Sequence, residues 1–182
     1  GTSDSTITFT RSEMFTDRDR DASYDTAGAT TIRFSDAAIT CENDQVSILD
    51  STVTISSGGT YILSGSSAQA QIIIDTPDDD KVQLVLSDLT LSCETSAPIY
   101  VRNADKVFIT LADGSDNSLS TTGEFVQIDD NNIDAVIFSK EDLTLNGTGS
   151  LTITSAYGHG IVSKEDLVVT DGTYTMTCAG HG

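Results

Sequence analysis

Tryptophan is missing from this chain of 182 residues, and proline and cysteine are scarce, with two and three copies respectively. The cysteines, Cys41, Cys93 and Cys178, form no CxxC or CxxH spacing, and their odd number argues against a disulfide framework. We expect them to be small, partly buried core residues. No apolar run approaches the roughly 20 residues that a membrane-spanning helix needs, so no membrane-spanning segment is predicted.

Basic residues are the next shortage, because nine lysines and arginines stand against 28 aspartates and glutamates, and the net charge is −19. Such a surface repels the phosphate backbone, so no nucleic-acid partner is expected. An anionic membrane surface is excluded for the same reason. Repulsion among the acids works against the compact state. Bound divalent cations would relieve it, and a solvated acidic surface is the alternative interpretation.

Helical patterning is nearly absent as well. Its place is taken by short β-branched runs with alternating polarity, such as KVQLVLS (81–87), KVFITL (106–111) and LTITS (151–155). Glycine, aspartate, asparagine and serine separate these runs. Many short strands of this kind are typical of an all-β protein.

The chain also repeats itself. The pentapeptide SKEDL stands at 139–143 and again, 24 positions later, at 163–167. The runs at 81–86 and 106–111 resemble each other in the same way. A period of 22–25 residues with two or three short strands fits one coil of a β-solenoid. Coils stacked about 4.8 Å apart would form ladders of like apolar residues. The expected ladders are Leu143 over Leu167, Leu145 over Val169 and Ile137 over Ile161.

A β-sandwich is the competing all-β arrangement. It is favoured by Asp-Gly at 113–114, Asn-Gly at 146–147 and Asp-Gly at 171–172, because such pairs commonly form hairpin turns. It supplies no reason for a fixed short period, and the solenoid is therefore the predicted fold.

One extra stretch separates the repeats. IYVRNADKVFITL (99–111) resembles VIFSKEDLTL (136–145), and the alignment treats Lys106 as an insertion, which sets Asp105 opposite Asp142. Between the two runs lies ADGSDNSLSTTGEFVQIDDNN, which is too long for an ordinary turn.

A single domain over residues 1–182 is expected, with a capping segment at 1–30 and the coils at 31–182. The chain ends at AGHG, where another coil should begin. An uncapped end exposes unpaired strand edges. We therefore expect either a fragment that lacks its C-terminal coils or a subunit that docks end to end.

Two acidic groups are candidate calcium sites. Asp129, Asp130 and Asp134 lie in the run DDNNID, the densest group of oxygen-bearing side chains in the chain. Asp142 and Asp166 come together if the SKEDL copies stack. Calcium takes six to eight oxygen ligands, which carboxylates and turn carbonyls supply, so Ca²⁺ is the expected cofactor. The alternatives are a solvated loop for the first group and neutralisation by the neighbouring SKEDL lysines for the second.

No catalytic constellation stands out. The motifs GxSxG and HExxH are absent, and the many carboxylates single out no pair for glycoside hydrolysis. A lyase on this type of fold usually needs a basic proton acceptor, and Arg102 and Lys106 are the only basic pair in the middle coils. The chain is therefore expected to bind rather than to catalyse. Without tryptophan, ladders of Thr, Ser and Asn are candidate sugar-binding groups.

Four runs carry a resemblance to a known family. They are GTYILSGSSAQAQIIIDTPDDDKVQLVLSDLTL, APIYVRNADKVFITLADGSDNSL, DAVIFSKEDLTLNGTGSLTI and HGIVSKEDLVVTDGTYTMT, which together cover roughly residues 50–182. The chain resembles the bacterial extracellular carbohydrate-binding domain proteins, which fold as a right-handed parallel β-helix and are related in architecture to pectate lyases. The family's chain normally continues into further coils after HG, where this chain ends.

The resemblance implies Ca²⁺ binding, affinity for cellulose or pectic polysaccharides, no clear catalysis and an extracellular or cell-surface location. The sequence thus predicts a non-catalytic, calcium-binding carbohydrate-binding or adhesion module for plant-type polysaccharides. Two alternatives stay open. One is a structural subunit that stacks end to end into an extracellular fibre, and the other is a polysaccharide lyase.

Overall fold

The computed structural model describes residues 3–9, 23–24, 28–41, 46–127, 133–156 and 158–178. Every regular element in these ranges is a β-strand, so the prediction of an all-β protein is confirmed. The same ranges hold no helix that is long and apolar enough to cross a bilayer.

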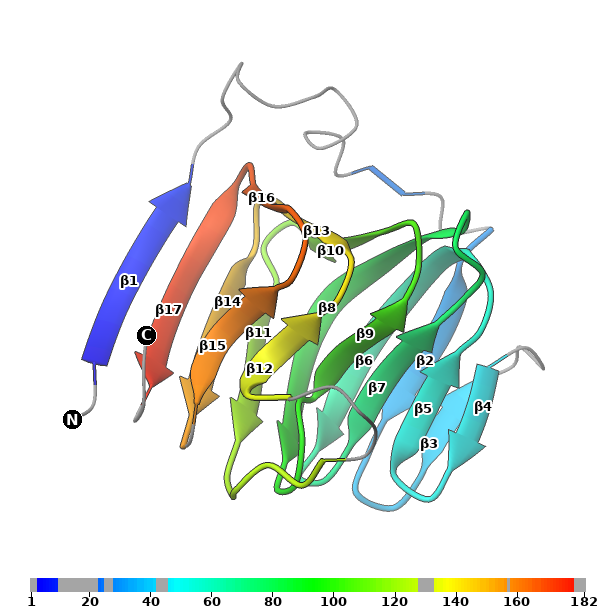
Figure 1. Cartoon of the computed structure of the whole chain (residues 1–182), viewed down its shortest axis with the longest axis horizontal. Helices are drawn as coiled ribbons and strands as arrows, with labels where there is room; N and C mark the ends of the chain where they lie inside the picture. Colours follow the sequence, from blue (N-terminus) through cyan, green and yellow to red (C-terminus); the bar gives the residue numbers. More distant parts are fainter. Residues whose placement is uncertain are drawn as a thin grey trace.

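The strands form one sheet of eleven strands and one of six (Figure 1). The larger sheet contains β1 (Ser3–Phe9), β2 (Thr30–Phe34), β3 (Ile39–Cys41), β6 (Gly59–Ser67), β8 (Lys81–Cys93), β10 (Lys106–Leu111), β11 (Asp116–Thr121), β13 (Asp142–Gly147), β14 (Ser150–Ser155), β16 (Leu167–Val169) and β17 (Gly172–Cys178). The smaller sheet contains β4 (Val46–Leu49), β5 (Thr52–Ile55), β7 (Gln71–Asp75), β9 (Ile99–Asn103), β12 (Ala135–Ser139) and β15 (His159–Ser163).

Most neighbouring strands are parallel, and each pairs with a strand from the next copy of the repeat. The strand β13 lies beside β16, and β12 lies beside β15. These pairings confirm the three predicted ladders of like residues. The ladders are Leu143–Leu167 and Leu145–Val169 in β13–β16, and Ile137–Ile161 in β12–β15. Copies of the repeat that follow one another in the sequence thus lie side by side in the sheets.

The Asp-Gly and Asn-Gly turns do not close hairpins. They join β10 to β11, β13 to β14 and β16 to β17, but the strands so joined pair with other strands in each case. Gly114, Gly147 and Gly172 have positive φ angles there, of 71°, 89° and 105°. The hairpin signals therefore mark bends between two parts of the larger sheet.

The strand register corrects one sequence alignment. The strands β10 and β13 pair without interruption, with Lys106 opposite Asp142 and Val107 opposite Leu143. Lys106 is therefore not an insertion, and the prediction that Asp105 lies opposite Asp142 is wrong. A continuous ladder keeps the backbone groups of both strands paired, which an inserted residue would interrupt. The extra chain lies instead between β11 and β12.

Apolar side chains pack in two clusters. The main cluster draws buried residues from both sheets, among them Leu84, Ile109 and Ile137. A second cluster contains Tyr100 and Phe138. Because successive side chains of a strand point to opposite faces, this second cluster lies on the other face of the smaller sheet. The chain between β11 and β12 covers it with Phe125 and Ile133.

The strand β1 lies beside the last strand of the larger sheet (Figure 1). It pairs antiparallel with β17, from Ser3 opposite Cys178 to Phe9 opposite Gly172. Residues 3–9 of the expected capping segment at 1–30 thus lie at the edge of β17, and most of that segment lies outside the described residues. The physical reason for the pairing is that β17 would otherwise present an edge of unpaired N–H and C=O groups, and β1 pairs with them.

The other end of the stack also finishes on antiparallel strands. The strand β3 pairs antiparallel with β2, and β4 pairs antiparallel with β5. Among the described strands β3 and β4 have a neighbour on one side only, and so do β15 and β16 at the opposite end, where the outermost pairs are parallel. Leu167, at the start of β16, is 44% exposed. The end of the described stack at β15 and β16 is thus partly open.

Replacing Gly147 by alanine tests the bend after β13. Gly147 has a φ of 89°, and a Cβ at this position would collide with the backbone of Leu111. We expect Gly147→Ala to lower the free energy of unfolding by about 3 kcal/mol, the upper end of the cost of backbone strain. Gly114→Ala is the matched control, because Gly114 has a φ of 71° and no atom within 4 Å of the added Cβ. We expect it to cost about 1 kcal/mol. Denaturant unfolding measures both losses, and equal losses would contradict the collision.

Removing residues 1–9 tests the role of β1. The deletion leaves the edge of β17 unpaired, and an open strand edge favours pairing with another chain. We expect the shortened chain to form larger species than the full chain at equal concentration, as measured by sedimentation velocity. Circular dichroism checks that the strands are retained. If the shortened chain sediments as the full chain does, after correction for mass, β1 does not protect this edge.

Candidate functional site

Three basic residues stack in a row at the ends of three strands of the smaller sheet. This basic row consists of Arg102 in β9, Lys140 after β12 and Lys164 after β15. Backbone hydrogen bonds set the stacking, because the Lys140 N–H donates to the Val101 carbonyl at 3.1 Å and the Lys164 N–H donates to the Ser139 carbonyl at 2.8 Å. The row gathers three of the nine basic residues of the chain.

Buried aromatic rings lie under the basic row. The Cζ atom of Arg102 is 5.5 Å from the centroid of the Tyr100 ring, and Nζ of Lys164 is 5.6 Å from that of Phe138. The two ring centroids are 5.9 Å apart. A cation within about 6 Å of a ring centroid is attracted by the ring's quadrupole. The rings therefore help to hold both cationic groups over the outer face of the sheet.

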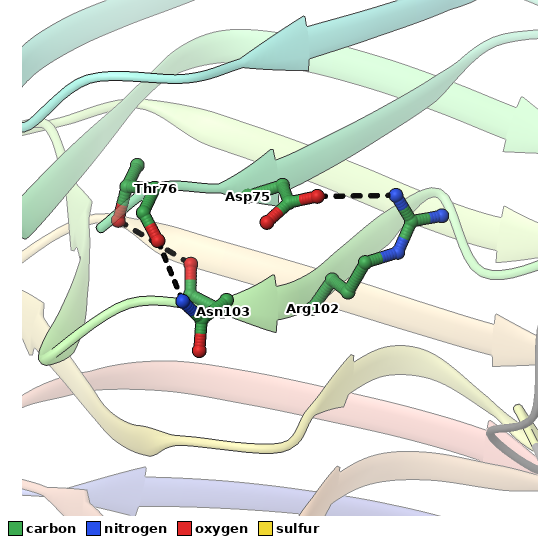
Figure 2. A network of polar contacts seen from close by, with 4 residues as sticks. All are labelled: Asp75, Thr76, Arg102 and Asn103. Atoms are coloured by element: carbon green, nitrogen blue, oxygen red, sulfur yellow. Dashed lines mark hydrogen bonds and ion pairs between the residues drawn. The ribbon is translucent and has the colours of Figure 1, made fainter. Parts of the chain in front are cut away.

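A polar network anchors the first member of the row (Figure 2). Arg102 Nη1 donates to Asp75 Oδ2 at 3.3 Å and so joins β9 to β7. Beside it, Asn103 Nδ2 donates to the Thr76 carbonyl at 2.7 Å, and the Thr76 N–H donates to the Asn103 carbonyl at 2.9 Å. Because the side chains of Arg102 and Asp75 are 34% and 41% exposed, solvent screens their attraction. The network therefore positions Arg102 more than it stabilises the fold.

The two SKEDL copies stack next to the basic row. The Asp166 N–H donates to Asp142 Oδ1 at 3.1 Å. The Ser163 hydroxyl donates to the Glu141 carbonyl at 3.0 Å. A carboxylate that accepts from a backbone N–H gains a charge-assisted hydrogen bond. This bond offsets part of the repulsion between the stacked aspartates.

Glu141 carries the unfavourable part of this stacking. Burial raises the pKa of the Glu141 carboxyl, and the Glu165 carboxylate on the next copy raises that pKa further. Lys140 acts in the opposite direction and favours the charged form. At this residue Lys140 therefore offsets part of the repulsion, and the pKa stays raised.

Asp134 is the described member of the first predicted calcium group, and Asp129 and Asp130 lie outside the described residues. Its Oδ1 is buried and has no hydrogen-bond partner among the residues that the structure describes. Its Oδ2 is 3.8 Å from Nε2 of His159. A buried carboxylate oxygen without a partner is costly. Asp134 therefore fits a cation bound at this position.

The second predicted group, Asp142 and Asp166, is brought together but does not make a complete metal site. Within the described ranges, no three His, Cys, Asp or Glu residues are grouped so that they could hold a metal ion. The hydrogen bond from the Asp166 N–H occupies Asp142 Oδ1. The pair therefore needs further oxygen ligands from elsewhere to bind calcium.

The sequence-based expectations did not include the rings under the cations. Tyr100 lies in the apolar run Ile-Tyr-Val and Phe138 in the apolar run Ala-Val-Ile-Phe, so alternation does not tell which of their neighbours face the core. The signal that could locate the basic row is the repeat itself. Arg102 occupies in β9 the position that Lys140 and Lys164 occupy in the two SKEDL copies.

The variant Glu141→Gln tests the charge balance of the stacked SKEDL copies. Because the pKa of Glu141 is higher in the folded than in the unfolded state, the folded state favours the protonated carboxyl. The stability that this protonation contributes is fully present below the unfolded-state pKa and is lost as pH rises through the folded-state pKa. We therefore expect the variant to be more stable than the parent at about pH 7, by roughly 0.5 kcal/mol for a partly exposed like-charge pair. The difference should vanish at about pH 3, where both forms are uncharged.

Thermal unfolding in EDTA measures this difference without contribution from a bound cation. Glu124→Gln is the matched control, since Glu124 is exposed in the chain after β11 and its replacement removes the same charge. A Glu141→Gln variant that is less stable than the parent near neutral pH would contradict the stacking argument.

Comparison with known proteins gives one family and two relatives. The family model described as carbohydrate-binding domain-containing protein matches residues 49–182. A protein of the same description from Acetivibrio thermocellus is 36% identical over 149 residues, which cover 80% of this chain and 52% of the relative. The solved structure of the polysaccharide lyase-like protein from C. thermocellum, a gadolinium derivative, is 34% identical with a TM-score of 0.71, over 78% of this chain and 58% of that one. The chain thus spans little more than half the length of each relative.

Proposed function

Because the chain belongs to the family of carbohydrate-binding domain-containing proteins, we propose that it is a non-catalytic, calcium-dependent module that binds plant-type polysaccharides. The observation that carries this proposal is the basic row over its buried aromatic rings. An extracellular or cell-surface location and a role in adhesion are part of the proposal, because polysaccharides of this type are met outside the cell.

The basic row favours an acidic, pectic polysaccharide as the ligand. Arg102, Lys140 and Lys164 lie on successive strands, and neighbouring strands are about 4.8 Å apart. The row therefore offers cations at regular short intervals. A polyuronate carries a carboxylate on every sugar and complements such a row. The remaining protein surface, with its excess of acids, repels the polyuronate. The basic row therefore also sets where the polyuronate binds.

Calcium is proposed at two acidic positions, namely at Asp134 before β12 and, at the other end of that strand, beside the row at Asp142 and Asp166. Asp134, with its buried unpartnered Oδ1, would hold the ion together with Asp129 and Asp130 of the same run. Asp142 and Asp166 would hold one only together with carboxylates of the polysaccharide. Calcium takes six to eight oxygen ligands. When bound, it supplies positive charge that offsets the repulsion between an acidic protein and an acidic chain.

We also propose that the two sheets are sides of a right-handed parallel β-helix. Support comes from the parallel register between strands one repeat apart. The chain also returns to the smaller sheet once in each repeat, at β9, β12 and β15. Crossovers between parallel strands of one sheet are nearly always right-handed, which favours that hand.

End-to-end assembly is a second candidate function, and the partly open end of the stack favours it. The strands β15 and β16 have one neighbour each among the described strands, and Leu167 is 44% exposed. A second copy that stacked there would pair these edges. Catalysis as a lyase has less support, because a lyase needs a basic proton acceptor, whereas the Arg102 guanidinium keeps its proton and is engaged by the Asp75 carboxylate.

Binding of polygalacturonate and of cellulose, each in Ca²⁺ and in EDTA, tests the proposal. We expect polygalacturonate to bind in Ca²⁺ and EDTA to weaken this binding. Lys164→Gln should weaken it about fivefold, as expected for the loss of a partly exposed ion pair worth roughly 1 kcal/mol. Isothermal titration calorimetry measures both effects.

Arg33→Gln is the matched control, because Arg33 is exposed on β2 at the other end of the stack and its replacement removes the same charge. Equal binding by the Lys164→Gln and Arg33→Gln variants would remove the basic row from the site. Absence of heat with both polysaccharides would overturn the binding function. Absorbance of unsaturated products, followed in the same samples, would identify a lyase.

A further inference from the structure

A second candidate site lies away from the basic row, where the larger sheet bends. It is a cavity of about 160 Å³ between Tyr24 and the turns that precede β11, β14 and β17. Each turn contributes one polar residue to its lining, namely Asp113, Thr148 and Asp171. We call this the Tyr24 cavity. Its walls come from parts of the chain that are far apart in sequence.

The wall that carries Tyr24 is fixed to the sheet by a buried polar ladder. Gln83 Nε2 donates to the carbonyl oxygen of Ser23 at 3.2 Å and to Oγ1 of Thr110 at 2.9 Å. The Thr110 hydroxyl donates in turn to Asn146 Oδ1 at 2.6 Å. The side chains of the ladder are at most 4% exposed, and buried polar groups hold their partners strongly. The position of Tyr24 is therefore tied to three strands through its neighbour Ser23.

Both carboxylates of the cavity are held through one oxygen. Asp113 Oδ1 accepts from the Thr148 hydroxyl at 2.7 Å, and Asp171 Oδ1 accepts from the Gly172 N–H at 2.9 Å. The described residues provide no hydrogen-bond partner for Oδ2 of either carboxylate. The two aspartates are thus oriented by the protein and keep acceptor capacity for a ligand.

This combination of groups selects a small, uncharged ligand rich in hydroxyl donors. Ionised carboxylates only accept hydrogen bonds, and two of them repel an anionic ligand. An aromatic ring offers an apolar face against which the C–H groups of a ligand pack. The cavity is smaller than the roughly 300–1,000 Å³ of sites for drug-sized molecules. A metal ion is not favoured, because the described residues supply no third acidic, His or Cys ligand here.

We propose that the Tyr24 cavity binds a single neutral sugar ring, with Tyr24 packing against its apolar face and Asp113 and Asp171 accepting from its hydroxyls. This inference rests on the proposed carbohydrate-binding function and adds a subsite with the opposite charge preference. The basic row takes acidic sugars, whereas the Tyr24 cavity takes neutral ones. Tyr24 lies outside residues 49–182, over which the family model matches, so the cavity is completed by a part of this chain beyond that match.

Titration of the full chain with neutral and acidic oligosaccharides tests the inference. The neutral probes are cellotetraose, xylotetraose and mannotetraose, and the acidic probe is tetragalacturonate. We expect at least one neutral probe to bind, and tetragalacturonate not to displace it. Tyr24→Ala and the double variant Asp113→Asn, Asp171→Asn should each weaken neutral-probe binding about tenfold, equal to about 1.4 kcal/mol. Tyr24→Phe keeps the ring and should bind as the parent does.

Two controls separate this inference from the proposed function. Asp50→Asn removes a carboxylate from a different cavity, of about 220 Å³, whose lining contains Asp36 and Gln69 but no aromatic residue, and it should leave neutral-probe binding unchanged. Lys164→Gln should weaken polygalacturonate binding only. Failure of all three neutral probes to bind, or equal binding by Tyr24→Ala and the parent, overturns the cavity as a sugar site. Either result leaves the polygalacturonate test of the basic row standing.

Discussion

Parallel pairing between strands one repeat apart is the constraint on which the rest of this structure depends. It sets the same position of successive copies side by side, so each residue lies next to its own counterpart. For apolar positions this is favourable, as in the ladder of Leu143 and Leu167, because like side chains pack well and the backbone groups of both strands are paired. For charged positions the same rule brings like charges together. Glu141 shows the cost, since burial and the Glu165 carboxylate of the next copy both raise the pKa of its carboxyl.

Neighbouring groups offset part of this repulsion between like charges, and some of them belong to the surface at which we propose that a ligand binds. The acidic positions of the SKEDL copies lie directly beside the basic row, so Lys140 partly offsets the charge next to Glu141. The Asp166 N–H donates to the Asp142 carboxylate. The Arg102 and Lys164 cations lie over buried aromatic rings. A repeat that must place lysine next to lysine thereby presents cations at regular intervals. The spacing that brings like charges together is also the spacing that we propose an acidic polysaccharide follows.

The parts of the chain that do not repeat cover what the repeats leave open. The segment between β11 and β12 covers the outer side of the smaller sheet with Phe125 and Ile133. The N-terminal part supplies β1 to the edge of β17 and sets Tyr24 over the bend of the larger sheet. A regular stack offers many equivalent positions along its length. The irregular segments distinguish one position from the others. The segment between β11 and β12 packs against the rings under the basic row, and Tyr24 lines the Tyr24 cavity.

The sequence by itself determined the all-β class, the repeat length and the apolar ladders. Alternation of polarity is a property of neighbouring residues, and the period is visible as similar runs at a fixed spacing along the chain. It also indicated that Asp142 and Asp166 come together. Only the tertiary structure decided the uninterrupted register at Lys106, the pairing of β1 with β17 and the meeting of Tyr24 with the turns of the larger sheet. These features depend on which unpaired edge or uncovered face remains after the repeats have stacked. No local pattern records such a choice, since the residues involved are brought together by hydrogen bonding and packing across most of the chain.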